Sequence, residues 1–212
     1  MKLEMLFDLA EKENIIVEYV DFSPTIQGIY YKADGCLPII GINESIVSDK
    51  KLFTCVLAEE LGHHFTSIGD SSAECYSLAD RINLNKIELV ALKWATEYLL
   101  PLDEIIDAVK KGIENMEKLS DFLGVTDGFL LERFKFIAKK QPYIRIQEDL
   151  SIILTNLPNV YLFREFYKNK GNNNPAMDKN NGEILTGDGN NRSVTRGNND
   201  ELVAEKKAGY HI

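Results

Sequence analysis

The sequence predicts an α+β domain in which a small N-terminal β-sheet precedes a mainly helical remainder. Three runs rich in β-branched and aromatic residues follow one another within residues 15–43. Beyond residue 48, apolar residues recur instead at helical spacing. The 212 residues suffice for one such domain with additional segments, and an apolar content of 44% is typical of a globular protein.

The first elements follow from local patterns. Apolar residues at helical spacing predict a short helix over residues 1–13. Runs at 15–20, 26–31 and 37–43 predict three strands, and an Asp-Gly pair at 34–35 indicates a hairpin turn between the last two. We therefore expect a small antiparallel or mixed sheet.

Five helices are expected between this sheet and residue 140. Ser48 and Asp49 are N-cap candidates for a helix that runs to about residue 66. A second long helix is expected over 85–100, since Pro101 disfavours its continuation, and a third over 102–112. Residues 115–139 predict two more helices around Gly124, an arrangement similar to a helix-turn-helix.

The end of the chain changes in composition. We expect a domain over residues 1–140 and a helical extension over 141–169, with residues 148–168 helical although Pro158 interrupts them. Residues 170–212 are rich in Asn and Gly and have few apolar residues, which predicts a disordered tail.

Charge and composition restrict the function. The net charge of −9 disfavours direct binding to nucleic acid, because an acidic surface repels phosphates. No run is apolar and long enough to cross a membrane, and no signal peptide is visible, so the expected compartment is the cytoplasm. Three Cys without C-x-x-C spacing argue against a disulfide framework and a Cys-rich zinc site.

A zinc-peptidase motif with one letter changed occupies residues 57–64, which read L-A-E-E-L-G-H-H. In the pattern H-E-x-x-H, two His one helical turn apart bind zinc and the Glu activates a water molecule. Here Glu60 occupies the position of the general base, and His63 that of the second ligand. Glu59 stands where the pattern has its first His.

Glu59 is a chemically permissible metal ligand. Residues i and i+4 on a helix project from the same face, and zinc accepts carboxylate oxygen as well as imidazole nitrogen at about 2.0–2.2 Å. A second carboxylate would leave less positive charge on the metal and acidify its water less, and it would favour a harder ion such as Mn²⁺. The motif thus predicts a metal site of altered reactivity.

A third ligand is expected on the next helix. Glu88 follows His63 by 25 residues, and Ala91 and Ala95 are small residues one turn apart that would let this helix pack closely on the motif helix. The motif, together with E-x-x-A-x-x-W-A-x-x-x-L-L-P from residue 88, resembles the ImmA/IrrE family of metallopeptidases.

This resemblance covers about residues 1–140 and implies a minimal zincin-like fold. It implies Glu60 as the general base and His63 and Glu88 as zinc ligands, with Glu59 where the family most often has His. It also implies a cytoplasmic peptidase of a prophage or other mobile element. Its substrate would be a helix-turn-helix repressor, whose cleavage releases transcription.

Other interpretations stay open at this point. Glu59 and His63 could be an ordinary helix pair, and Cys55, one turn earlier, could replace Glu59 as ligand or be a buried apolar residue. The protein could also be an impaired zincin that binds and sequesters a regulator. DNA binding through residues 116–136 is the weakest alternative, since few basic residues follow Gly124.

Overall fold

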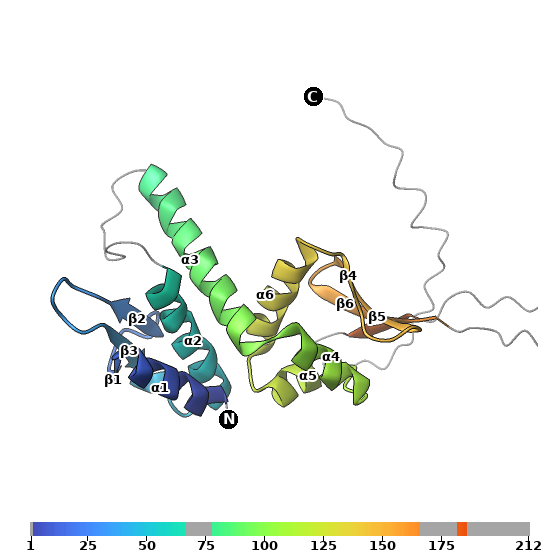
Figure 1. Ribbon diagram of the computed structural model, residues 1–212, viewed down its shortest axis with the longest axis horizontal. Helices are drawn as coiled ribbons and strands as arrows, with labels where there is room; N and C mark the ends of the chain where they lie inside the picture. Colours follow the sequence, from blue (N-terminus) through green and yellow to red (C-terminus); the bar gives the residue numbers. More distant parts are fainter. Residues whose placement is uncertain (1, 67–77, 166–181, 186–212) are drawn as a thin grey trace, which may run out of the picture.

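The α+β prediction is confirmed by a computed structural model, which describes residues 2–66, 78–165 and 182–185 (Figure 1). The helices in these residues are α1 (Lys2–Lys12), α2 (Lys50–Thr66), α3 (Leu78–Leu99), α4 (Leu102–Lys110), α5 (Met116–Leu123) and α6 (Asp127–Ala138). The strands are β1 (Ile16–Val20), β2 (Gly28–Tyr31), β3 (Ile39–Asn43), β4 (Tyr143–Arg145), β5 (Leu150–Asn156), β6 (Asn159–Arg164) and β7 (Gly182–Leu185).

The first sheet is mixed and has the order β1-β3-β2. β1 pairs with β3 in parallel, and β2 pairs with β3 in antiparallel orientation. The expected turn between β2 and β3 is present, and Gly35 has a φ of +76°, which favours glycine. Ile40 and Ile42 of β3 are fully buried, so the central strand anchors the sheet to the helices.

Asn43, at the end of β3, fixes the segment that leads into β2. It is 1% exposed, and its side-chain amide donates to the carbonyls of Phe22, Ser23 and Ile26. Its side-chain oxygen accepts from the Ser45 N–H, which caps the 3₁₀ turn over Glu44–Ile46. One buried amide therefore sets where β2 begins and how the chain approaches α2.

Helices α2 and α3 form the centre of the domain and cross very closely. The Asp49 carboxylate accepts from the N–H groups of Lys51 and Leu52, so the predicted N-cap is confirmed. A Cβ atom on Gly62 would lie 2.4 Å from the Ala91 carbonyl oxygen, so the two backbones are in direct contact there. Close packing through small residues was predicted, although α3 begins at Leu78, earlier than expected.

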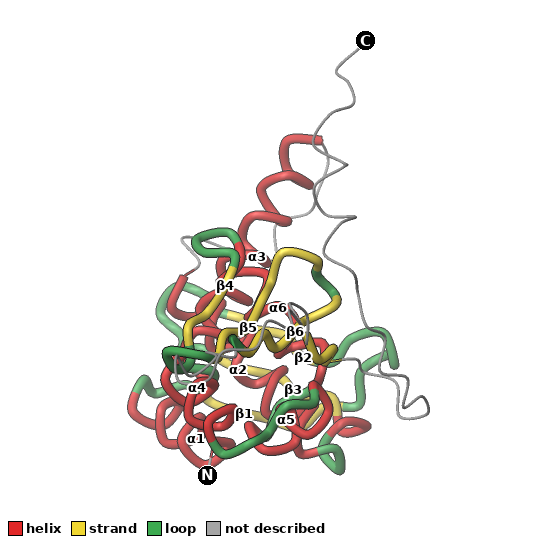
Figure 2. Tube along the Cα trace, turned by 90° about the vertical axis from the view of Figure 1, so that its right-hand side faces the viewer, coloured by secondary structure: helices red, strands yellow, loops and turns green. Residues whose placement is uncertain are grey.

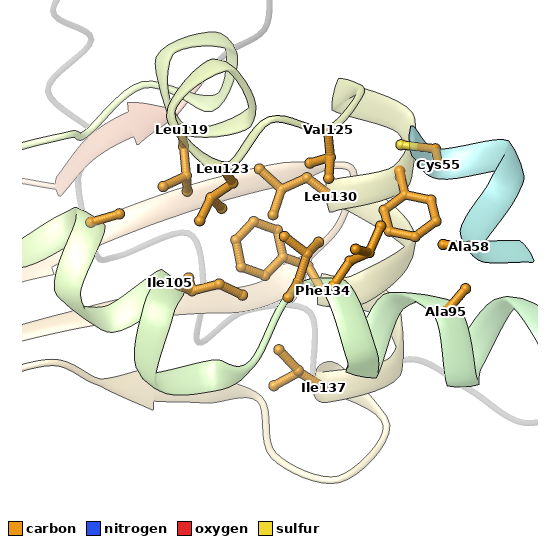
Figure 3. Packing of buried hydrophobic residues seen from close by; sticks show 14 of the residues in the cluster. Cys55, Ala58, Ala95, Ile105, Leu119, Leu123, Val125, Leu130, Phe134 and Ile137 are labelled. Carbon is orange, nitrogen blue, oxygen red and sulfur yellow. The ribbon is translucent and has the colours of Figure 1, made fainter. Parts of the chain in front are cut away.

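Helices α5 and α6 form the predicted hairpin, and both contribute to one hydrophobic core that they share with α2, α3 and α4 (Figure 3). Gly124 ends α5 with a φ of +67°, and Thr126 caps α6 through its hydroxyl. Leu130 and Phe134 of α6 are fully buried. Six of the 12 residues of α6 are buried, so one side of this helix faces the core.

The prediction of a helix over residues 148–168, and with it of a helical extension over 141–169, is wrong. Strands β4, β5 and β6 lie there in a second, antiparallel sheet of order β4-β5-β6-β7 (Figure 2). The adjacent residues Ile152 and Ile153 obscured the period of two that is typical of a strand. The buried residues at alternate positions are Leu150, Ile152, Leu154, Val160 and Leu162. Pro158 lies in the turn that joins β5 to β6.

Two expectations fall wholly or mostly outside the described residues. Residues 69–72, whose Gly-Asp-Ser-Ser sequence predicts a break after the motif helix, lie in the gap between α2 and α3. Of the predicted disordered tail, the structure describes only Gly182–Leu185, the strand β7 that pairs with β6. Among the described helices, none has the length and apolarity that a membrane span requires.

The contact between Gly62 and Ala91 predicts the effect of a single methyl group. Gly62→Ala should lower the free energy of unfolding by about 1–3 kcal/mol, because the added Cβ must separate two backbones. Urea unfolding measures the change. Gly128→Ala is the matched control: no atom lies within 4 Å of its Cβ position in α6, so it should be neutral or stabilise by up to about 1 kcal/mol. Equal stability of the two variants would contradict the close crossing.

Candidate metal and peptide site

A pocket lies between the C-terminal half of α2, the middle of α3 and strand β2. Six residues line it: Gly28, Ile29, Tyr30, Glu60, His63 and Glu88. Three elements that are far apart in the sequence therefore meet at the motif. The pocket contains three of the four residues that the sequence singled out, together with a wall of β2 that it did not predict.

His63 and Glu88 face each other across this pocket. The Nε2 atom of His63 lies 3.3 Å from Oε2 of Glu88. Two ligands of a tetrahedral zinc at about 2.0–2.1 Å are themselves about 3.3–3.4 Å apart, so this pair has the separation that one ion would require. Among the described residues, however, no group of three or more His, Cys, Asp or Glu residues is close enough together to form a metal site.

Glu59 is near this pair but does not line the pocket. Its carboxylate interacts electrostatically with His63, with Glu88 and with Glu132 of α6. Burial raises the pKa of Glu59 to about 7, the His63 charge lowers it, and the other two acids raise it. His63 and Glu88 supply donor atoms that a divalent ion accepts, and Glu59, one helical turn before His63, stays the third predicted ligand.

Glu60 is held against β2. A Cβ atom on Gly28 would lie 2.7 Å from Oε1 of Glu60, so only glycine leaves room for this carboxylate. Burial raises the pKa of Glu60 to about 7, whereas the charge of His63 and a hydrogen bond from the Tyr30 N–H lower it. A carboxyl group that titrates near neutral pH is suited to accept a proton from water.

His63 has one satisfied and one unsatisfied ring nitrogen. Burial lowers its pKa, but the contact with Glu88 and the charges of Glu60 and Glu59 raise it more, so the net shift is upward. Its Nδ1 atom is buried without a hydrogen-bond partner in the described part of the chain. A metal-binding histidine usually donates its second N–H to a carbonyl or carboxylate. That supporting contact is missing here.

The wall of the pocket is the open edge of β2. The Asn43 N–H donates to the Gln27 carbonyl, and the antiparallel register pairs Gly28 with Ile42. In such a ladder alternate residues bond to the neighbouring strand, so the N–H and C=O groups of Gly28 and Tyr30 point away from β3. In the described residues β2 has no second neighbouring strand. An extended peptide could pair with this edge.

The β2 wall was missed by sequence reasoning, although a signal existed. Gly28 interrupts a run of apolar and aromatic residues, and a glycine inside a strand often marks the close approach of another group. His64 is the last residue of the motif on α2. Its side chain is 13% exposed and its ring contacts Tyr30. Its pKa is lowered by burial and by Lys32 against the opposing charge of Glu13.

Cys55 does not line the pocket. Its side chain is 3% exposed, and its sulfur accepts from the Thr126 N–H at 3.4 Å. Burial raises the pKa of the thiol to about 11, so the thiol stays protonated at neutral pH. The structure favours the buried apolar interpretation of Cys55 over its use as a ligand.

An imidazole and several carboxylates thus lie on two closely packed helices, beside an open strand edge. The sequence profile of the IrrE N-terminal-like domain, peptidase family M78, matches residues 10–135. The chain therefore belongs to this family of metallopeptidases, and the resemblance to ImmA/IrrE is confirmed. Such peptidases usually depend on zinc and act on protein substrates. No curated protein and no solved structure matches the chain.

The raised pKa values of Glu59 and Glu60 predict how stability depends on pH. Between the ordinary value of 4.5 and about 7, the folded chain retains protons that the unfolded chain has lost. The free energy of unfolding of chelator-treated protein should therefore fall as pH rises through this window, by on the order of 2 kcal/mol for each carboxyl group. The pKa of His63 is also raised from its ordinary value of 6.5. Loss of its proton above that pH should therefore also lower the free energy of unfolding.

Urea unfolding at a series of pH values measures this slope. Glu60→Gln should reduce it, because the amide does not titrate, whereas Glu117→Gln, at an exposed position of α5, should leave it unchanged. A stability that rises over the same pH range would contradict the burial of these acids.

Proposed function

We propose that the chain is a zinc-dependent endopeptidase that cleaves a transcriptional repressor or regulator, with a prophage or other mobile element as its genetic context. The observation that carries the proposal is the 3.3 Å approach of His63 Nε2 to Glu88 Oε2, with Glu60 in the same pocket. Membership of a metallopeptidase family supports the reaction type. The repressor substrate and the mobile element follow from the ImmA/IrrE resemblance.

His63, Glu88 and Glu59 would hold the zinc ion. When bound, zinc would polarise the peptide carbonyl and acidify water. Three acids surround one imidazole in this region, and two of them have pKa values of about 7. A divalent cation would offset the repulsion among these carboxylates, so the electrostatics of the site support metal binding.

Glu60 would act as the general base. It would take a proton from water while the water oxygen adds to the carbonyl carbon of the peptide, and it would pass that proton to the leaving nitrogen as the C–N bond breaks. Two features place the Glu60 carboxylate for this role. Gly28 has no side chain and leaves room for the carboxylate, and the N–H of Tyr30 donates a hydrogen bond to it.

The shape and charge of the molecule support a basic protein substrate. The open edge of β2 offers backbone groups to an extended segment beside Glu60. Residues 171–212 carry a net charge of −1, so the preceding residues carry −8 of the total −9. An acidic surface attracts basic partners, and DNA-binding repressors are typically basic.

A second candidate function is favoured by two observations at the metal site. Glu59 replaces the usual His and does not line the pocket, and His63 Nδ1 lacks a supporting partner in the described residues. An impaired site of this kind would suit a binding module that sequesters the regulator. Such a module would bind its partner through the β2 edge without cutting it.

Glu60→Gln tests the peptidase directly. Zinc-loaded wild-type protein should cleave members of a mixed peptide library, with the products identified by mass spectrometry. The variant should bind zinc equally well and cleave at least 10²-fold more slowly, because the amide cannot take the proton. Glu117→Gln, a change of the same kind on exposed α5, should keep full activity. Full activity of Glu60→Gln would reject the assigned base, and an inert wild type would favour the binding module.

A further inference from the structure

Strand β2 has only one partner strand in the described sheet, so side-chain contacts must fix its open side. Gly28 contributes none, because it has no side chain and merely allows Glu60 to approach. Tyr30 is the next residue of β2 on the same face. Its hydroxyl lies 3.0 Å from Nδ1 of His64, near the end of α2.

The spacing of strand and helix explains why these two contacts occur together. Gly28 and Tyr30 are two residues apart on β2, which is about 6.6–6.8 Å. Glu60 and His64 are four residues apart on α2, which is about 6.0 Å. The strand therefore runs along the helix with Gly28 over Glu60 and Tyr30 over His64, and it is fixed at the second contact by a hydrogen bond.

Glu13, in the turn that follows α1, lies near the His64 ring. Its Oε2 atom lies 4.0 Å from Nε2 of His64, on the side opposite Tyr30. A carboxylate there favours the tautomer that carries its proton on Nε2. Nδ1 is then an acceptor, and the Tyr30 hydroxyl donates to it.

The His64 ring also connects this strand to the helix that carries Glu88. Its centroid lies 5.0 Å from that of Phe65, which stacks at 4.8 Å on Trp94 of α3. Trp94 stacks in turn at 4.9 Å on Tyr98. One row of rings thus joins β2, α2 and α3, the three elements that form the pocket.

We propose that Tyr30 and His64 are positioning residues, which fix the open edge of β2 at the separation from Glu60 that an extended peptide requires for cleavage. The substrate effect rests on the proposed peptidase function, whereas the positioning itself does not. Tyr30 holds its backbone N–H at the Glu60 carboxylate, and its C=O and the N–H and C=O of Gly28 where a peptide would pair. Loss of the hydroxyl would let β2 move without disturbing His63 or Glu88.

Hydrogen exchange of the full chain tests the positioning independently of activity. In Tyr30→Phe, which keeps the ring and removes only the hydroxyl, amides of residues 28–31 should exchange at least about tenfold faster than in wild type. Tyr31→Phe is the matched control, since this side chain lies on the other face of β2 and is 49% exposed. Unchanged exchange in Tyr30→Phe overturns the inference, whatever the activity.

Kinetics on a peptide that the zinc-loaded wild type cleaves then test the consequence. Tyr30→Phe should lower kcat at least about tenfold with unchanged zinc affinity, and Tyr31→Phe should lower neither. His64→Asn should retain most of the activity, because the Asn side chain offers an acceptor near the position of Nδ1, whereas His64→Ala should behave as Tyr30→Phe. The double variant Tyr30→Phe/His64→Ala should be no worse than either single one.

Hydrogen exchange and kinetics together distinguish failure of the positioning proposal from failure of the proposed peptidase function. Faster exchange in Tyr30→Phe with an inert wild type would reject the peptidase and leave the positioning pair established. Faster exchange with unchanged kcat in an active enzyme would overturn the claim that the pair serves cleavage.

Discussion

The site depends on one steric constraint, the contact of two helix backbones at Gly62 and Ala91. No side chain separates α2 from α3 at this point, and the position of a Cβ atom on Gly62 is 2.4 Å from a carbonyl oxygen. His63 follows Gly62 directly, and Glu88 lies one turn before Ala91. The close crossing therefore brings an imidazole and a carboxylate within 3.3 Å of each other. Glu60, one turn before His64, is left to face β2.

Electrostatics sets the second condition on this site. Glu59, Glu60 and Glu88 surround one histidine, and burial of the first two raises their pKa values to about 7. Such an arrangement costs stability unless a cation or protons compensate the charge. Replacement of the usual first His by Glu59 adds to this cost, which a bound divalent cation would offset. The cost is consistent with a site retained for chemistry and not for stability.

Several features of the fold and of the site could be predicted because they depend on residues close together in the sequence. The i, i+4 spacing of Glu59 and His63, the cap at Asp49 and the turn at Gly124 depend on neighbours along the chain. Glu88 was found through the small residues that follow it. The role of Tyr30 was not predictable in this way, since it depends on a contact with His64, which lies 34 residues further along the chain. The helix predicted over residues 148–168 failed because an isoleucine pair hid the alternation of two strands.

The central claim is that His63 and Glu88 form one metal site with Glu59. Elemental analysis by mass spectrometry on protein purified without a metal-affinity step tests it most directly, with Glu88→Ala as the paired variant. We expect about one zinc ion per wild-type chain and its loss in Glu88→Ala. Wild-type protein that holds no metal even after zinc is supplied would contradict it.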